Sequence, residues 1–126
     1  MKLIDALRLD PNQRLALTGA GGKSAELFQI GRELHAQTGG LVILSATTHL
    51  ALDQIGFADF HIVFEQEQLS PSEVKAIQNG LVLITGPKAS ENRTHGLSFS
   101  QIDYLKGLAD QLSAPLIVEA DGSRQH

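Results

Sequence analysis

A glycine-rich segment near the amino terminus has the residue types and the spacing of a phosphate-binding loop. It follows a short apolar run at 15–17 and precedes an amphipathic segment, so a glycine turn joins a strand to the start of a helix. Glycines let the backbone approach a phosphate closely, and the first amides of a helix point at the anion. The residues expected to bind the nucleotide here are Gly19, Ala20, Gly21, Gly22, Lys23 and Ser24.

The last two residues of this loop carry its specific chemistry. Lys23 is expected to act in catalysis by reaching the β- and γ-phosphates, and the Ser24 hydroxyl is expected to bind the accompanying Mg²⁺. The leading glycine is Gly19, and position 17, where a standard Walker A loop begins, is Leu17. This compact form resembles the loop of the Mur ligases, which also begins with Thr-Gly. A nicotinamide dinucleotide site is disfavoured, because Ser24 stands where that motif has Gly or Ala.

Two acidic residues follow an apolar run at 116–118, an arrangement typical of a Walker B strand. Glu119 and Asp121 are two positions apart, so on a strand both carboxylates point to one face and can address the same Mg²⁺. One is expected to be a metal ligand and the other a base or a group that positions water, which makes both candidates for catalysis. The alternative is a solvated strand end that Asp121 and Gly122 turn.

A third polar cluster follows the apolar run at 41–45. The hydroxyls of Thr47 and Thr48 can bind Mg²⁺, its water or a γ-phosphate, and His49 can orient a water or stabilise charge during catalysis. The alternative is a turn in which the threonines satisfy their own backbone. Because ligands of open parallel sheets bind beyond the carboxyl ends of the strands, we expect the three polar segments to converge on one edge.

Apolar runs alternate with helical patterns along the chain, which favours an α/β fold of three layers, a mostly parallel sheet with helices on both faces. This is the layout of a P-loop NTPase-like domain. We expect strands at 15–18, 41–45, 61–64, 81–85 and from 116 onward. We expect helices at 23–37, from the capping box at 70–73 to about 79–80, and after a cap at Ser98 or Ser100.

Three parts of the chain are interpreted with less regular structure. The segment 51–59 is ambiguous and is interpreted as one helical turn. The segment 88–97 is interpreted as a solvated polar loop, and the alternative is that its Lys88, Arg93 and His95 reach an anionic substrate. His35 and His61, like His95, show no metal-ligand spacing and are expected to be ordinary surface or core histidines.

Composition limits the class of protein. The 126 residues are expected to form a single domain, and the acidic motif lies so near the last residue that we expect an amino-terminal part of a longer protein, truncated at its carboxyl terminus. A net charge of −4 without any Lys/Arg run disfavours nucleic acid as a partner. The absence of cysteine excludes thiolate catalysis. With no signal peptide and no apolar span for a membrane, a cytoplasmic location is expected.

The three polar motifs in combination, Gly-Ala-Gly-Gly-Lys-Ser, Ala-Thr-Thr-His and Glu-Ala-Asp-Gly-Ser-Arg, resemble the YqeC family, from about residue 15 to 124. Its members are described as accessory proteins of selenium-dependent molybdenum hydroxylases. The resemblance implies such a hydroxylase, or its cofactor machinery, as partner. It also implies a nucleotide and Mg²⁺ at the matching residues, which are Gly19, Gly22, Lys23, Ser24, Thr47, Thr48, His49, Glu119 and Asp121.

The leading hypothesis is therefore a Mg²⁺-dependent NTPase that binds ATP or GTP and acts in the maturation of a molybdenum enzyme. Two alternatives stay open. One is a switch module that binds a nucleotide or a phosphorylated cofactor without turnover. The other is a Mur-like ligase or kinase that passes the γ-phosphate to an acceptor.

Overall fold

A parallel five-stranded sheet forms the centre of the molecule, seen in a computed structural model that describes residues 14–17, 23–47, 49–77 and 79–119. The strand order is β1-β8-β2-β5-β4, and every neighbouring pair is parallel. The strands are β1 (Arg14–Leu17), β2 (Val42–Ala46), β4 (Phe60–Val63), β5 (Leu81–Thr85) and β8 (Leu116–Glu119). All five lie within one residue of their expected positions, except that Thr18 is outside the described residues.

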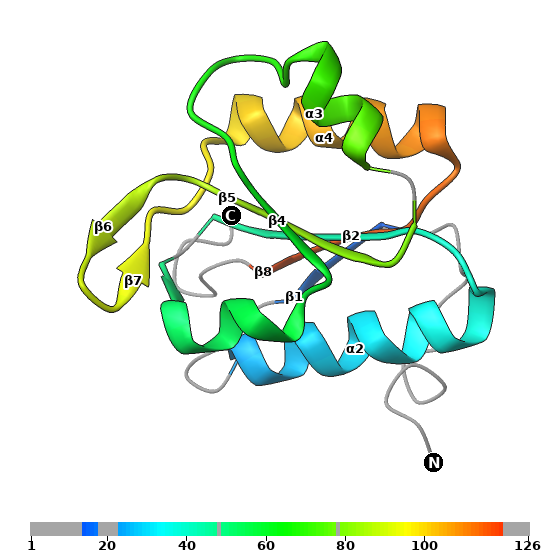
Figure 1. The fold of residues 1–126 in the computed structure, drawn as a ribbon, viewed down its shortest axis with the longest axis horizontal. Helices are drawn as coiled ribbons and strands as arrows, with labels where there is room; N and C mark the ends of the chain where they lie inside the picture. Colours follow the sequence, from blue (N-terminus) through cyan, green and yellow to red (C-terminus); the bar gives the residue numbers. More distant parts are fainter. Residues whose placement is uncertain (1–13, 18–22, 48, 78, 120–126) are drawn as a thin grey trace.

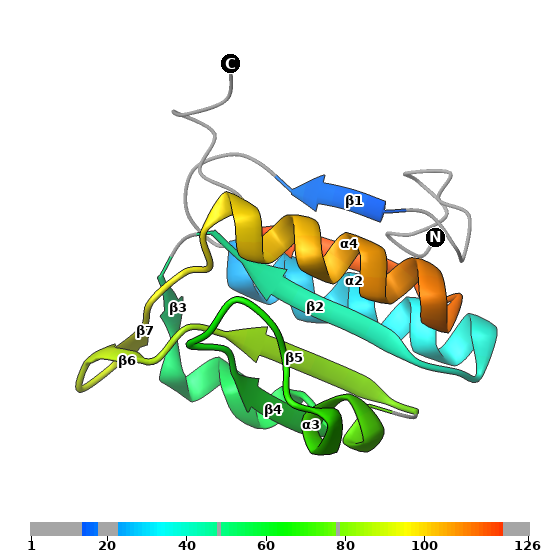
Figure 2. The same ribbon diagram turned by 90° about the horizontal axis from the view of Figure 1, so that it is seen from above.

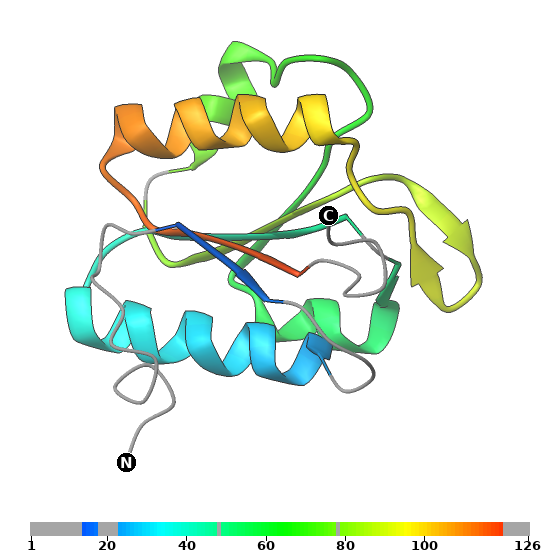
Figure 3. The ribbon, with the colours of Figure 1, turned by 180° about the vertical axis from the view of Figure 1, so that it is seen from behind.

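Helices cover both faces of this sheet and give three layers, as expected (Figure 1). One face carries α2 (Lys23–Thr38) and the 3₁₀ helix η1 (Leu52–Phe57), and the other carries α3 (Pro71–Ala76) and α4 (Phe99–Leu112). The view from behind shows the same separation (Figure 3). Within the described part of the chain, no helix has the length and apolarity needed to cross a membrane.

The handedness of crossover connections explains which helix covers which face. The chain moves from β1 to β2 and on to β4 in one direction across the sheet, and returns through β5 to β8 in the other. Because crossovers between parallel strands are right-handed, the outward and return connections must lie on opposite faces. The outward connections hold α2 and η1, and the return connections hold α3 and α4.

The sheet has a hydrophobic core on each face, which accounts for the apolar strands. β2 and β5 are buried along their whole length, as expected of strands covered on both faces. The core between α2 and the sheet includes Leu27, Phe28, Ile30, Leu34 and Leu44. The core between α4 and the sheet includes Ile43, Ile84, Ile102, Leu105 and Leu108.

Capping boxes start both helices of the second face. The Ser98 hydroxyl accepts a hydrogen bond from the Gln101 amide at 3.2 Å, and the Gln101 side chain accepts one from the Ser98 amide at 3.0 Å. Ser98 is therefore the cap of α4, and Ser100 is not. The same pattern joins Ser70 and Glu73 at the start of α3.

The expectation that this helix continues to about residue 79 is wrong, because α3 ends at Ala76. Ile77 leaves the helical conformation and is buried in the core beneath α4. Gly80 has a φ of 88°, a conformation that glycine adopts without strain and that leads the chain into β5. The need to bury Ile77 and enter the sheet thus shortens the helix.

A second sheet of three short antiparallel strands flanks the carboxyl ends of the parallel strands (Figure 2). Its order is β3-β7-β6, with β3 at Leu50–Ala51, β6 at Lys88–Ser90 and β7 at Arg93–Thr94. The expectation of a solvated loop over 88–97 is therefore wrong in part. Strands of two or three mostly exposed residues show no alternating pattern, so the sequence alone gives no signal for them.

Two glycines in helices offer a matched test of the packing. A Cβ on Gly31 of α2 would lie 2.7 Å from Leu81 Cδ1 and 3.0 Å from Leu44 Cδ2, whereas one on Gly107 of α4 would meet nothing within 4 Å. Overpacking costs about 1–3 kcal/mol, and Ala in a helix gains about 1 kcal/mol over Gly. We expect Gly31→Ala to lower the free energy of unfolding by ~1 kcal/mol and Gly107→Ala to raise it by ~0.5–1 kcal/mol, measured by urea denaturation. A stabilised Gly31→Ala protein would show that α2 does not pack on the sheet as described.

Candidate functional site

The strands that carry the three polar motifs end side by side. Leu17 of β1 is in register with Glu119 of β8, and Glu119 is in register with Ala46 of β2. Since all three strands are parallel, the segments that follow them begin at the same edge of the sheet. The expected convergence is confirmed for these strand ends.

The predicted loop residues are described only in part. Gly19, Ala20, Gly21 and Gly22 lie outside the described residues, as do Thr48 and Asp121. Lys23 and Ser24 form the first turn of α2, and their side chains are not among those described. α2 returns antiparallel to β1, so its first turn lies at the edge where the strands end (Figure 1). The described backbone thus has a strand before the loop residues and a helix after them, the order that the loop requires.

Glu119 is the last residue of β8 and is only 6% exposed. Its backbone carbonyl accepts a hydrogen bond from the Thr47 amide at 2.9 Å and a longer one from the Thr47 hydroxyl at 3.5 Å. Thr47 therefore continues the pairing of β2 with β8, rather than satisfying only its own backbone. These contacts join the backbones of two of the three motifs at the edge.

A chain segment that sequence reasoning did not assign to the site, 95–97, lies across the ends of β2 and β5. The Leu97 amide donates to the Ala46 carbonyl at 2.8 Å, and the Gly86 amide donates to the His95 carbonyl at 3.0 Å. A Cβ on Gly86 would lie 2.9 Å from the His95 carbonyl oxygen, so the close approach requires glycine. The sequence offered one signal for this contact. A polar segment lies between Gly86 and Gly96, and the apolar Leu97 follows it.

This segment also places a second histidine beside His49. The rings of His49 and His95 have centroids 5.5 Å apart and lie at 78° to each other, and both residues are exposed. His49 thus flanks the edge together with a partner from the hairpin of β6 and β7. His95 is exposed, as expected of a surface histidine, and its ring contact with His49 is a feature that the sequence did not predict.

His61 has a structural role, as its lone position in the sequence indicates. The Thr85 hydroxyl donates its hydrogen to the Gly86 carbonyl at 2.9 Å. The Thr85 oxygen therefore accepts the second hydrogen bond, at 2.7 Å, from His61 Nε2. Partial burial of the ring lowers the pKa of His61 below its usual value of 6.5. The bond ties β4 to the end of β5.

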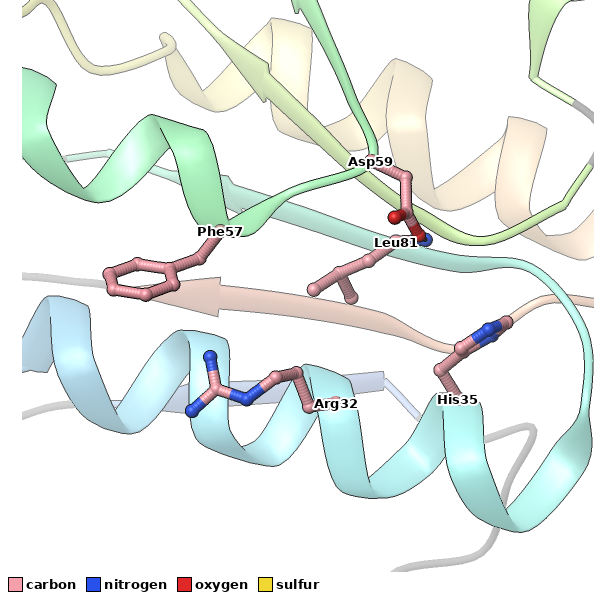
Figure 4. Close-up of a pocket in the computed structure, with 5 residues that line it drawn as sticks. All are labelled: Arg32, His35, Phe57, Asp59 and Leu81. Atoms are coloured by element: carbon pink, nitrogen blue, oxygen red, sulfur yellow. Dashed lines mark hydrogen bonds between the residues drawn. The ribbon is translucent and has the colours of Figure 1, made fainter.

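A pocket lies near the opposite edge of the sheet (Figure 4). It is lined by Arg32, His35, Phe57, Asp59 and Leu81. Its polar groups are already engaged. Asp59 accepts from the Leu81 amide at 2.8 Å, His35 Nδ1 lies 2.6 Å from the Gly40 carbonyl, and Arg32 stacks 5.5 Å from the Phe57 ring centroid. Because Leu81 begins β5, this pocket is distant from the three motifs.

The described residues contain no group of three or more His, Cys, Asp or Glu side chains that could hold a metal ion. Mg²⁺ bound with a nucleotide does not need such a group, since it takes one or two carboxylates and otherwise phosphate and water oxygens. The buried carboxylate of Glu119 at the end of β8 is the kind of donor that this ion uses. The residues present therefore fit a nucleotide-bound Mg²⁺.

Comparison with known proteins gives one match. The model of a protein family described as YqeC protein matches residues 15–126. Neither the curated proteins nor the solved structures include a significant match.

The pKa of His61 makes stability depend on pH. Its folded-state pKa lies below the unfolded value of about 6.5, so the unfolded chain binds the proton more readily. The contribution of His61 is complete above pH 6.5 and is lost as pH falls through the folded pKa. We expect the midpoint of urea unfolding to fall between pH 7.5 and 5.5, and to fall less in His61→Gln. An equal fall in both proteins would contradict the burial of this ring, and exposed His95→Gln serves as the control.

Proposed function

The chain belongs to the YqeC family, and from this premise we propose that it is a Mg²⁺-dependent nucleoside triphosphatase in the maturation of a selenium-dependent molybdenum hydroxylase. Family membership supports the coarser part, a role related to such hydroxylases. The nucleotide-binding part rests on the residues and on their arrangement in the sheet.

The observation that carries the proposal is the register of three adjacent strands. Leu17, Glu119 and Ala46 lie at one level, so the glycine loop, the acidic motif and the threonine-histidine cluster leave the sheet at one edge. Ligands of parallel sheets bind at this edge. A loop for phosphates beside an acidic strand end is the arrangement that a nucleotide with Mg²⁺ requires.

Each motif has a distinct role in the proposed site. The amides of the loop and the Lys23 ammonium bind the β- and γ-phosphates. Ser24, Glu119 and Asp121 hold Mg²⁺, while Thr47 and Thr48 flank the γ-phosphate. The buried position of Glu119 suits this role, because a carboxylate removed from water interacts more strongly with a cation.

Hydrolysis at this site is an in-line displacement. A water oxygen attacks the γ-phosphorus, the bond from that phosphorus to the β,γ-bridging oxygen breaks, and the products are the nucleoside diphosphate and inorganic phosphate. The proton of the water passes to a carboxylate, Glu119 or Asp121, or to His49. No Asn-Lys-x-Asp motif for reading guanine occurs in residues 1–126, which favours ATP over GTP.

The first test is calorimetric titration with ATP and Mg²⁺. Removing the ammonium in Lys23→Ala deletes a charge-assisted contact worth about 2–3 kcal/mol, so the Kd is expected to rise roughly 30- to 150-fold. The matched control is Lys106→Ala, because Lys106 is exposed on α4, where its ammonium lies 3.7 Å from the carboxylate of Asp103. Its Kd should stay within about twofold of the parent. An unchanged affinity in Lys23→Ala, with the circular dichroism of the parent, would refute the phosphate loop.

The second test concerns the acidic motif. Asp121→Asn removes one charge from the proposed Mg²⁺ ligands, so half-maximal ATP binding is expected to need about tenfold more Mg²⁺. Asp103→Asn, at an exposed position of α4, is the control. Identical Mg²⁺ titrations of Asp121→Asn and the parent would remove Asp121 from the site.

Formation of the nucleoside diphosphate by the parent protein, with and without an acceptor, then separates the reaction classes. Turnover with Mg²⁺ alone supports hydrolysis. Binding without turnover instead indicates a switch module, and turnover that appears only with an acceptor indicates a ligase or kinase.

A further inference from the structure

The small antiparallel sheet has one buried and one exposed face beside the proposed nucleotide site. Leu50 of β3 and Thr94 of β7 are directly opposite and are 1% and 2% exposed, so this pair points into the protein. Side chains alternate along a strand. The neighbours of this pair, His49, Arg93 and His95, are all exposed on the other face.

These three residues form a compact group, which we name the histidine–arginine cluster. The ladder that pairs Leu50 with Thr94 brings His49 opposite His95, and their ring contact at 5.5 Å follows that pairing. Arg93 is the first residue of β7 and precedes His95 by two residues, a spacing of about 7 Å in an extended chain, and both side chains are exposed. Each imidazole ring carries at least one N–H donor and the guanidinium carries five, so several hydrogen-bond donors for an oxyanion are close together.

Charge also gathers on this hairpin. The lysine and arginine side chains that the structure describes are Arg32, Lys75, Lys88, Arg93 and Lys106. Two of these five, Lys88 and Arg93, belong to β6 and β7, with Glu91 at the turn between the strands. In a chain with a net charge of −4, this is a local positive region that favours an anion.

The backbone holds the cluster in place at the edge of the main sheet. The His95 amide donates to the Pro87 carbonyl at 2.8 Å, and its carbonyl accepts from Gly86 at 3.0 Å. His49 follows Thr47 by two residues, and Thr47 is bonded to Glu119. The cluster is therefore pre-positioned next to the strand ends, which lowers the entropy cost of binding.

We propose that the histidine–arginine cluster binds the phosphate group of a second small molecule, distinct from the nucleotide. The cluster follows β2, whereas the proposed phosphate loop follows β1, and β8 separates the two strands. Two strand spacings are about 10 Å, so a phosphate at the cluster and the phosphates at the loop can be bound at the same time. The identification of this ligand as a second substrate rests on the proposed function. The existence of a phosphate subsite at the cluster does not depend on it.

The experiment follows the imidazole resonances of His49 and His95 by NMR at pH 7.0 while inorganic phosphate is added. Saturating ADP and Mg²⁺ are present in one arm, so that the nucleotide loop is filled, and absent in the other. Both histidines should shift along one saturable curve in both arms. Arg93→Gln should weaken phosphate binding about tenfold, because an arginine–phosphate contact is charge-assisted. The matched arginine control, Arg32→Gln on α2, should leave it within twofold.

Each outcome decides between the sources of phosphate. A response that disappears when ADP and Mg²⁺ are present would assign the phosphate to the nucleotide loop and overturn the proposal. An equal loss in Arg93→Gln and Arg32→Gln would also overturn it, since the effect would then be one of net charge. His95→Gln, which keeps the backbone bonds of the segment, should weaken phosphate binding as well, and an unchanged affinity would contradict the cluster.

Failure of the two proposals is distinguishable. If ATP does not bind but phosphate still shifts His49 and His95, the proposed function fails and the subsite stands. If Arg93→Gln weakens ATP binding as much as phosphate binding, the cluster belongs to the nucleotide and the second ligand is refuted.

Discussion

The arrangement of the site depends on the parallel register of β1, β8 and β2. This register is fixed by backbone hydrogen bonds between strands that are brought together from opposite ends of the sequence, with Leu17, Glu119 and Ala46 at one level. A shift of one residue would turn the buried side chains of β2 and β8 toward the wrong faces. Burial of apolar side chains on both faces therefore sets where the polar segments leave the sheet.

The topology then decides which part of this edge can hold a ligand. The connections after β2 and β5 leave toward opposite faces, and the strand ends at such a point are where α/β sheets bind ligands. Here the chain itself lies across these ends, since segment 95–97 bonds to Ala46 and Gly86. The polar groups consequently form two sets. One set follows the strand ends of β1, β8 and β2, and the other is the histidine–arginine cluster at the small sheet beside them.

The sequence predicted the strands and helices that hydrophobic periodicity and capping residues indicate. It did not predict features that depend on contacts between residues far apart in the chain. Buried strands such as 81–85 and the capping box at 70–73 are local patterns, and both are confirmed. The end of α3 was wrong because it depends on the burial of Ile77 in the core. The strands β3, β6 and β7 are too short to show a period, so the contact of His49 with His95 needed the structure. The roles of Lys23 and Asp121 in binding stay predictions.

The central claim is that a nucleotide-bound metal lies where β1, β8 and β2 end. The most direct measurement replaces Mg²⁺ by paramagnetic Mn²⁺ with ATP and records the broadening of backbone amide signals by NMR. The amides of Glu119 and Thr47 should broaden strongly, and those of Gly39 and Val42 far less. Gly39 follows the last turn of α2, a helix about 24 Å long. Broadening centred on Gly39 and Val42, or none at Glu119 with ATP bound, would contradict the account.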